Sequence, residues 1–402
     1  MKIVGINSLG YGSPANIMNN ILITTKKEIG ADVYSFYGAW GKKSKYDISK
    51  RYGFTFENLI AKYLSKITGY QHIWCILNTQ ILIHELKKIN PDIIHLHNLH
   101  LWDINVPLLF KYIKKNKVKV VWTLHDCWSF TGQCPYFSEI GCDKWKHGCS
   151  HCKQLKRYPS TYIDNTKKMY RLKKEWFLGV DNLILVTPSN WLKGLVEESF
   201  LKQYPVYCIN NGIDTNIFYP RKSNFRINYN LKDKHIILGV SLEWGHRKGL
   251  DIFIKLSKIL SDEYKIVLIG VDEKLKKELP SNIISIARTH DQIELAEIYS
   301  SADIFLNPTR EDNYPTVNLE ALACGTPVIT SRNGGSPEMV LDQCGFVCDI
   351  DDIDEIIFFI NKILINRDSM RKSCVIAAQN FKDTKKFEEY IKLYEYLMKG
   401  YY

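Results

Sequence analysis

Short apolar runs alternate with helix-like segments along the whole chain, and this alternation limits the fold more than any other feature. Runs rich in β-branched residues and bounded by turn residues are typical of buried strands. A first set comprises KIVGIN, ADVYSFY, DIIHLH, VKVVWTL, NLILVTP and PVYCINN, and a second comprises HIILGVS, YKIVLIG, DIFLNP and PVITS. Strands that alternate with helices pair in parallel, with the helices as crossovers. The sequence therefore predicts an α/β protein with two doubly wound parallel sheets.

A polar, turn-rich segment separates the two sets of strands. NNGIDTNIFYPRKSN contains Gly212 and Pro220, which places a linker near Asp214 to Ser223. The chain of 402 residues is long enough for two hydrophobic cores. We expect one domain over residues 1–214, a second over 215–380, and a terminal helix over 381–402 whose default role is core packing.

Two glycines follow the first predicted strand, in SLGYGSPANIM. Ligands of doubly wound sheets bind beyond the carboxyl ends of the strands. Gly10 and Gly12 would let a phosphate or an acceptor approach the backbone where a helix begins near Ala15. Two glycines are equally typical of a tight turn, and the GxGxxG spacing of a dinucleotide site is not completed.

Histidines end two further predicted strands, in DIIHLHNLHLWD and WTLHDCWSFTG. Imidazole exchanges protons near neutral pH, and His125 is the preferred candidate for such a role. Asp126 would orient His125 or contact an acceptor. His97 and His100 are candidates for contact with an acceptor substrate. A buried histidine with a satisfied hydrogen bond is, however, also common at a strand end.

An acidic pair brackets a predicted helix start in PTREDNYPTVNLEALACGTPVIT, residues 308–330. Asp312 and Glu320 are eight positions apart, and carboxylates accept hydrogen bonds from the vicinal hydroxyls of a sugar or ribose. A helix N-terminus also suits a diphosphate. Acidic residues near a helix start are otherwise explained by the helix dipole.

A basic pair precedes another predicted helix, in SLEWGHRKGLDIFI. Arg247 and Lys248 would neutralise a diphosphate leaving group without a metal ion. A reaction that releases a diphosphate needs its developing negative charge to be stabilised in this way. The alternative is an ordinary basic pair on the surface.

These residues carry a resemblance to glycosyltransferase family 4. The segment from Asp312 to Glu320 resembles the family's Glu-x7-Glu signature, and LEALACGTPV resembles its continuation. The resemblance implies the GT-B fold, with two Rossmann-like domains facing a central cleft. It also implies that Glu320 binds the ribose and that the first acid, Asp312 or Glu311, holds the donor sugar.

The same resemblance assigns further residues. It places His125 beside the donor sugar and Lys248 at the diphosphate, but the arginine that family members carry six residues earlier is Leu242 here. Arg247 would replace that cation, or backbone N–H groups would do so. Further donor-site residues implied are Asn313, Gly334, Gly335 and Glu338, the last three in a GG-x-PE turn. The first domain would bind the acceptor, the second the donor, and the terminal helix would return to the first.

Cysteines gather in one loop, GQCPYFSEIGCDKWKHGCSHC. Cys134, Cys142, Cys149 and Cys152 could together hold a structural zinc, with His147 and His151 as spare ligands. The spacing lacks the paired CxxC of a strong zinc motif. Free reduced thiols are the alternative.

The net charge of +11 favours anionic partners. The basic and aromatic stretch KKMYRLKKEWF indicates either an interfacial helix at a membrane surface or a solvated helix with an apolar underside. No motif for nucleic-acid recognition accompanies the charge. The chain contains neither a long apolar run nor a signal peptide, so we expect a cytoplasmic protein, either free or peripheral at the plasma membrane.

The resemblance thus implies a retaining glycosyltransferase. We expect it to move a sugar from a nucleoside diphosphate donor to a saccharide or lipid-linked acceptor during assembly of a bacterial surface polysaccharide, with no cofactor needed for catalysis. Two alternatives stay open: a non-catalytic subunit of the same fold, and another GT-B enzyme such as a nucleotide-sugar epimerase. The sequence does not identify the base, the sugar or the acceptor.

Overall fold

The computed structural model describes residues 1–400 and divides the chain into two compact units. The first unit contains residues 1–210 and the C-terminal segment from Phe387, and the second contains Asn211–Lys386. The division falls just before the predicted linker at Asp214–Ser223. No helix in the described part of the chain is both long enough and apolar enough to span a membrane.

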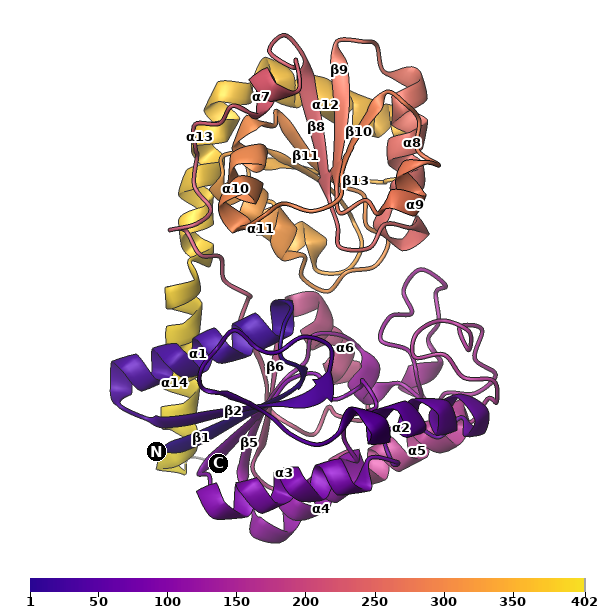
Figure 1. The fold of residues 1–402 in the computed structure, drawn as a ribbon, viewed down its shortest axis with the longest axis vertical. Coiled ribbons are helices and arrows are strands. Elements are labelled where there is room, and N and C mark those ends of the chain that lie inside the picture. The colour runs from indigo at the N-terminus through magenta and orange to yellow at the C-terminus, as the bar shows by residue number, and fades with distance from the viewer. Residues whose placement is uncertain (401–402) are drawn as a thin grey trace. The chain divides into compact units, whose positions relative to one another are not determined.

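The first unit contains a seven-stranded sheet in the order β3-β2-β1-β4-β5-β6-β7, and its pairings are all parallel (Figure 1). Its strands are β1 (Lys2–Leu9), β2 (Asp32–Trp40), β3 (Ser49–Arg51), β4 (Ile93–Leu96), β5 (Lys119–Thr123), β6 (Leu183–Thr187) and β7 (Val206–Cys208). The six predicted strands are confirmed. The short edge strand β3 is polar and partly exposed, so it left no apolar run in the sequence.

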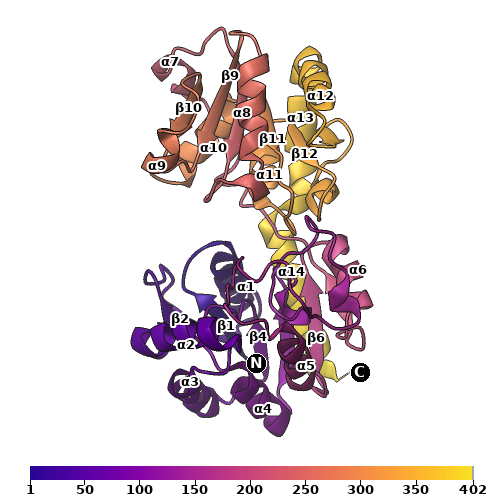
Figure 2. The same cartoon turned by 90° about the vertical axis from the view of Figure 1, so that its right-hand side faces the viewer.

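Helices cover both faces of this sheet (Figure 2). They are α1 (Ser13–Ile29), α2 (Thr55–Thr68), α3 (Ile76–Ile89), α4 (Val106–Asn116), α5 (Thr166–Phe177), α6 (Asn190–Glu198) and α14 (Asp383–Lys399). Helices α1 and the later part of α14 pack with Ile3 and Val121 in one apolar cluster. Helices α3, α4 and α5 pack against the other face in a second cluster that contains Trp122.

The second unit contains a six-stranded parallel sheet in the order β10-β9-β8-β11-β12-β13. Its strands are β8 (His235–Val240), β9 (Tyr264–Ile269), β10 (Ile283–Ile286), β11 (Ile304–Asn307), β12 (Val328–Ser331) and β13 (Gly345–Cys348). The four predicted strands are confirmed. The strands β10 and β13 at the two edges were not predicted, because each is short and contains only partly buried residues for most of its length.

Helices also cover both faces of the second sheet, with an apolar cluster on each side. They are α7 (Phe225–Asn228), α8 (Leu250–Ile259), α9 (Glu273–Lys276), α10 (Gln292–Ser301), α11 (Thr316–Ala323), α12 (Ile353–Ile365) and α13 (Arg367–Ala378). The strand order reverses at β8 and β11 here, and at β1 and β4 in the first unit. These reversals mark where doubly wound sheets bind ligands, beyond the carboxyl ends of the strands.

Candidate functional site

In the second unit, two loops meet at the reversal point of the sheet. The loop after β8 carries Arg247 and Lys248, and the loop after β11 carries Glu311 and Asp312. The Arg310 backbone N–H donates to the Arg247 carbonyl at 2.8 Å, and the Arg247 Nη1 group donates to the Glu311 carbonyl at 2.9 Å. The structure therefore brings the predicted cations and acids together.

Lys248 and Asp312 form an ion pair through Nζ and Oδ2, and their side chains are 19% and 16% exposed. Gly249 follows with φ of 69°, in the left-handed region. A Cβ atom there would lie 2.2 Å from the Pro308 carbonyl oxygen, so this position requires glycine. The close approach of the two loops is what sets Lys248 beside Asp312.

Arg310 also binds the loop after β8, although it was not among the predicted site residues. Its guanidinium donates to both Asp251 oxygens at 2.8 and 3.0 Å and to Asp351 Oδ1 at 2.8 Å. It also donates to the His246 carbonyl at 2.8 Å. Arg310 directly precedes the predicted acids in the sequence, but its partners lie far away along the chain.

Glu320 lies on α11, whose N-terminus has no capping side chain. The Tyr299 hydroxyl donates to Glu320 Oε2 at 3.0 Å, and burial raises the pKa of Glu320 to about 7. The buried Asn318 on the same helix accepts a hydrogen bond of 2.7 Å from Asn307 at the end of β11. The helix thus has a fixed position, with no side-chain cap at its start.

The predicted glycine pair lies against the backbone of the first acid. Gly334 has φ of 65°, and a Cβ atom there would lie 1.8 Å from the Asp312 carbonyl oxygen. The Gly335 N–H donates to the same oxygen at 3.3 Å. Glu338 follows in a short 3-10 turn, Ser336–Met339. The GG-x-PE segment and the acid therefore belong to one local structure.

The two candidates for the first acid differ in exposure. Glu311 is 3% exposed and lies within the loop, whereas Asp312 is partly exposed beside Lys248. Asn313, the third donor-site candidate of this loop, is 2% exposed. The geometry favours Asp312 as the acid that a ligand would reach.

In the first unit, histidines gather where β4 and β5 end. His97 Nδ1 and His125 Nε2 are 2.8 Å apart, and their rings stack with centroids 5.1 Å apart. Burial lowers the pKa of His125 to about 4, and the pKa of His97 is also lowered by burial. Both rings are therefore neutral at pH 7, and each offers a donor and an acceptor nitrogen.

His100 and Asp126, the other two residues expected to contact an acceptor substrate, form a second pair. His100 Nε2 lies 2.9 Å from Asp126 Oδ2, and the Tyr158 hydroxyl lies 3.0 Å from His100 Nδ1. Burial alone would raise the pKa of Asp126, but the neighbouring His100 brings it below its ordinary value. Asp126 is therefore an ionised carboxylate engaged with His100, and it is His97 that contacts His125 through a hydrogen bond.

A fourth histidine, His95, links this group to the C-terminal helix. His95 Nε2 lies 2.8 Å from Thr123 Oγ1, and His95 Nδ1 lies 2.6 Å from the Tyr394 hydroxyl on α14. The Tyr390 hydroxyl is 3.2 Å from Thr123. Sequence reasoning missed these partners, and the only signal was the aromatic spacing of the last helix.

The predicted glycines lie at the end of β1, the other strand of the reversal. A Cβ atom on Gly10 would lie 2.7 Å from the Tyr37 ring, so the position requires glycine for packing. Gly12 has φ of 84° and is the N-cap of α1, with no side-chain cap. The turn interpretation explains both residues without a ligand.

The four loop cysteines line one cavity of about 150 Å³ together with His151, while His147 is not among its lining residues. Burial raises the pKa of Cys149 to about 11 and that of Cys134 further. Within residues 1–400, no group of three or more possible ligands is arranged to hold a metal ion. The thiols lie close together as free cysteines.

Helix α5 contains the stretch KKMYRLKKEWF, and its apolar residues point into the protein. Met169, Tyr170 and Phe177 are buried, and Phe177 packs in the core cluster of Trp122. These side chains are therefore not available to a membrane surface, and contact of the basic first unit with a membrane stays a prediction. The alternative of a solvated helix with an apolar underside describes α5.

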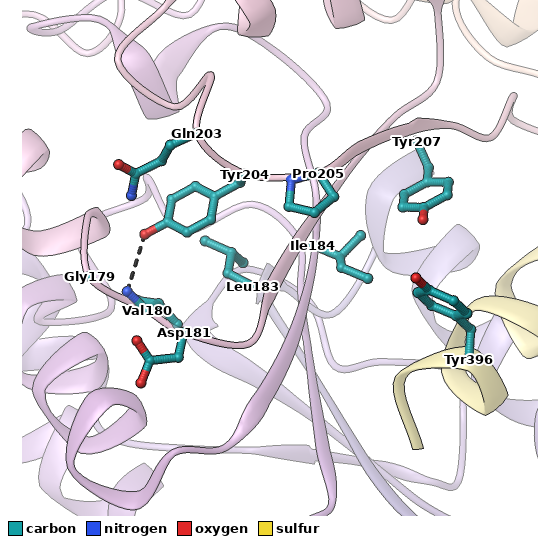
Figure 3. A pocket seen from close by; sticks show the side chains of 10 residues that line it. All are labelled: Gly179, Val180, Asp181, Leu183, Ile184, Gln203, Tyr204, Pro205, Tyr207 and Tyr396. Atoms are coloured by element: carbon teal, nitrogen blue, oxygen red, sulfur yellow. Dashed lines mark hydrogen bonds between the residues drawn. The ribbon is translucent and has the colours of Figure 1, made fainter. Parts of the chain in front are cut away.

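A separate cavity of about 460 Å³ contains none of the predicted site residues (Figure 3). It is lined by the starts of β6 and β7 and by Tyr396, and the Tyr204 hydroxyl accepts from the Val180 N–H at 3.1 Å. This cavity lies at the amino ends of the strands. Since ligands of parallel sheets bind at the carboxyl ends, it is not the candidate site.

Two family models match the chain and together cover most of it. The model described as "Glycosyltransferase Family 4" matches residues 30–217, and the one described as "Glycosyl transferases group 1" matches residues 221–381. The second match contains the Lys248 and Glu320 loops, and the first contains the histidines.

Curated relatives are also glycosyltransferases by name. WcaC of Escherichia coli K12, named for colanic acid biosynthesis, is 28% identical over 64% of this chain and 64% of its own length. WclY of Escherichia coli, named for O-antigen biosynthesis, is 30% identical over 33% of this chain and 39% of its own length. The chain therefore matches less than two thirds of the length of these relatives.

Solved structures share the whole fold. Sucrose-phosphate synthase of Thermosynechococcus elongatus has a TM-score of 0.72 at 18% identity and covers 99% of each chain. HepE of Anabaena, solved with UDP-glucose, has a TM-score of 0.64 at 14% identity and covers 98% of each chain. At these identities the likeness establishes the fold, and the expected pair of Rossmann-like α/β domains is confirmed.

Proposed function

This chain belongs to glycosyltransferase family 4, and we propose that it transfers a sugar from a nucleoside diphosphate donor to an acceptor hydroxyl with retention of configuration. The observation that carries the proposal is the contact of Lys248 with Asp312 and of Arg247 with the Glu311 carbonyl. Both contacts lie at the reversal point of the second sheet. Chemistry at a sugar diphosphate needs cations at the leaving group and acceptors at the hydroxyls, and this arrangement provides both.

The donor side is assigned to the second unit. The uncapped start of α11 and the cations Lys248 and Arg247 would bind the diphosphate, and Glu320 would accept hydrogen bonds from the ribose. Asp312 would hold the sugar, since it is the more exposed acid and lies beside Lys248. Gly334 and Gly335 support this role because their backbone packs on Asp312.

The acceptor side is assigned to the first unit. His125 is neutral at pH 7, so it would donate a hydrogen bond to the sugar without adding a charge. His97 would act as a positioning residue by fixing the His125 ring. The ionised Asp126 and its partner His100 are candidates for the acceptor.

The relatives in colanic acid and O-antigen biosynthesis support a place in the assembly of a bacterial surface polysaccharide. The acceptor would then be a saccharide or a lipid-linked saccharide, and the reaction would occur in the cytoplasm. HepE was solved with UDP and UDP-glucose, which supports a nucleotide sugar as donor. No cofactor is needed for this chemistry, because the side chains themselves neutralise the leaving group.

A donor screen tests the function. Purified protein is incubated with a set of nucleotide sugars, binding is followed as a rise in melting temperature, and release of nucleoside diphosphate is then measured for each binder. We expect release to fall in both Lys248→Ala and Glu320→Ala. Nucleotide binding without release would support the non-catalytic alternative, and release that is unchanged in both variants would contradict the proposed site.

We also propose that the cysteine loop takes up a structural zinc ion. Four thiols line one small cavity, and the buried Lys173 ammonium nearby donates to the Trp128 carbonyl at 2.7 Å and lies 3.8 Å from the Trp128 ring. Burial lowers the pKa of Lys173 to about 7, and a zinc ion held by four thiolates is anionic, so it would favour the protonated form of this amine. The thiols would have to converge on the ion, because they are not arranged as ligands without it.

Metal analysis of the purified protein tests the zinc site. We expect one zinc ion per chain, lost in the double variant Cys149→Ser with Cys152→Ser and retained in Cys208→Ser, which changes a cysteine outside the loop. Protein that contains no zinc after growth with the metal, or zinc that survives the double substitution, would remove the proposal.

A further inference from the structure

Helix α2 presents its apolar residues to solvent and its small and polar residues to the protein. The residues that it buries are Asn58, Ala61 and Ser65. The apolar residues of α2 and of the position before it are exposed by 37–73%: Phe54, Phe56, Leu59, Ile60, Tyr63 and Ile67. We name these six residues the α2 patch. A surface helix of a globular protein has the opposite arrangement.

Polar contacts, rather than apolar burial, hold α2 in place. The Glu57 carboxylate accepts hydrogen bonds from the Leu77 and Asn78 N–H groups at 2.8 and 2.7 Å, at the start of α3. The Asn78 side chain donates to Asn58 Oδ1 at 2.7 Å and to the Phe54 carbonyl at 3.1 Å. The orientation of the helix is therefore fixed, and the exposure of its apolar side is built into the fold.

The apolar surface continues beyond both ends of α2. Ile76 and Leu77, at the start of α3, are 47% and 60% exposed. At the other end, Tyr162 and Ile163 are 75% and 50% exposed, and the Tyr162 N–H donates to the Lys66 carbonyl at 2.8 Å. Exposed apolar residues grouped in this way mark an interaction site, because burial of each such side chain is favourable.

Positive charge surrounds the α2 patch. Lys62 and Lys66 lie on the helix itself, and the exposed Lys167 and Lys168 begin α5, with Lys168 Nζ 5.9 Å from the Tyr70 ring. In the first 210 residues, lysine and arginine outnumber aspartate and glutamate by about two to one, whereas the second unit is close to balanced. The one acid on α2, Glu57, is engaged with α3.

We propose that the α2 patch docks on an anionic lipid bilayer, with α2 lying in the plane of the interface. Exposed aromatic and aliphatic residues beside lysines are the features of an interfacial helix. A second copy of the chain fits less well, because a symmetric contact would bring the lysines of the two copies together.

This position would place the membrane beside the acceptor side of the first unit. Lys62 Nζ lies 5.9 Å from the Trp40 ring at the end of β2 and 5.5 Å from the Trp102 ring, which follows the histidines of β4. A lipid-linked acceptor would then reach His100 from the bilayer surface. This last step rests on the proposed function, whereas the docking itself does not.

Co-sedimentation with vesicles tests the docking without any substrate. We expect the full chain to bind vesicles of phosphatidylcholine with phosphatidylglycerol and to bind pure phosphatidylcholine far more weakly. Phe56→Ser with Tyr63→Ser should reduce partitioning at least about tenfold, since both apolar side chains are lost from the bilayer. Lys167→Glu with Lys168→Glu should remove the preference for the anionic vesicles.

A matched control uses exposed apolar residues of the second unit. Phe358 and Ile365 on α12 are 54% and 82% exposed, and Phe358→Ser with Ile365→Ser should leave binding unchanged. Thermal melts confirm that each variant folds. Unchanged binding of the α2 variant, equal binding to neutral vesicles, or a dimer in light scattering that the α2 variant dissociates would each overturn the proposal. Failure of sugar transfer would leave this result untouched.

Discussion

The two units hold their candidate residues by opposite electrostatic means. In the second unit the residues are charged, and ion pairs and backbone carbonyls fix them, as in the pair of Lys248 with Asp312. In the first unit the central residues are neutral, because burial lowers the pKa of His125 and His97. Charged groups suit the anionic diphosphate of a nucleotide sugar, whereas neutral imidazoles offer hydrogen bonds to hydroxyls without adding a charge.

The most sensitive test of this comparison is removal of the cation. Lys248→Ala should lower the turnover number by about 10²–10³, because the leaving diphosphate loses charge stabilisation that grows in the transition state. Steady-state kinetics with the donor identified in the screen measures the effect. Lys255→Ala, at an exposed position of α8, is the control. A change confined to KM would mean that Lys248 binds the ground state and the transition state equally well.

The neutral side is tested through His125. His125→Ala should lower the turnover number by about tenfold to a hundredfold, through loss of a hydrogen bond to the sugar. Since burial lowers the pKa of His125 to about 4, the turnover number should not fall between pH 7 and pH 5.5 because of this ring. A fall in the turnover number around pH 6.5 that is absent in His125→Ala would contradict the prediction that His125 is neutral at pH 7. His84→Ala, on the exposed side of α3, is the control.

Glu320 tests the charged residues of the second unit through pH. Burial raises the pKa of Glu320 to about 7, so its charge changes near neutral pH. At pH 6 the carboxyl is protonated, and at pH 8 it is ionised and accepts from both ribose hydroxyls. Affinity for the nucleoside diphosphate should therefore rise by about tenfold between these pH values. Calorimetric titrations of the native chain and Glu320→Gln measure it, with Glu273→Gln as an exposed control.

The same shift has a consequence for stability. The folded-state pKa lies above the ordinary value of 4.5, so the protonated carboxyl stabilises the ligand-free fold below pH 4.5. That contribution is lost as the pH rises through about 7.

For the binding prediction, a pH dependence that persists unchanged in Glu320→Gln would show that another group, such as the phosphate itself, is responsible.

The smallest expected effect is on folding stability, at Gly249, where the loops after β8 and β11 touch. Gly249→Ala should lower the free energy of unfolding by about 1–3 kcal/mol, because of the left-handed φ and the contact with Pro308. Gly245→Ala is the control, since no atom lies within 4 Å of an added Cβ there. Chemical denaturation measures both, and equal stability of the two variants would remove the proposed requirement for glycine.

Much of the fold could be predicted because its signals are local. Buried parallel strands are apolar along their whole length, so β1, β5, β8 and β11 were visible as runs. The edge strands β3, β10 and β13 were not predicted, since short, partly buried strands leave no such run. Lys248 and Asp312 in loops, and Glu320 on α11, were predicted as site residues through spacing and resemblance, and their roles stay predictions.

Partners that lie far away along the chain could not be predicted. Arg310 with Asp251 and Asp351, and Tyr394 with His95, are pairs that only the packing of elements creates. Helices α5 and α2 show the same limit. The basic and aromatic pattern of α5 left an interfacial and a solvated helix open, and only the structure shows its apolar side packed in the core, while α2 leaves its apolar side exposed.

The sequence by itself determined two parallel α/β domains and the family, and it predicted the loops of the site, because strand periodicity and motif spacing are written in neighbouring residues. Only the tertiary structure decided which acid is exposed, that the histidines are neutral, and that α2 rather than α5 turns its apolar side outward. Burial and charge pairing depend on which distant segments meet, and no local pattern contains that information.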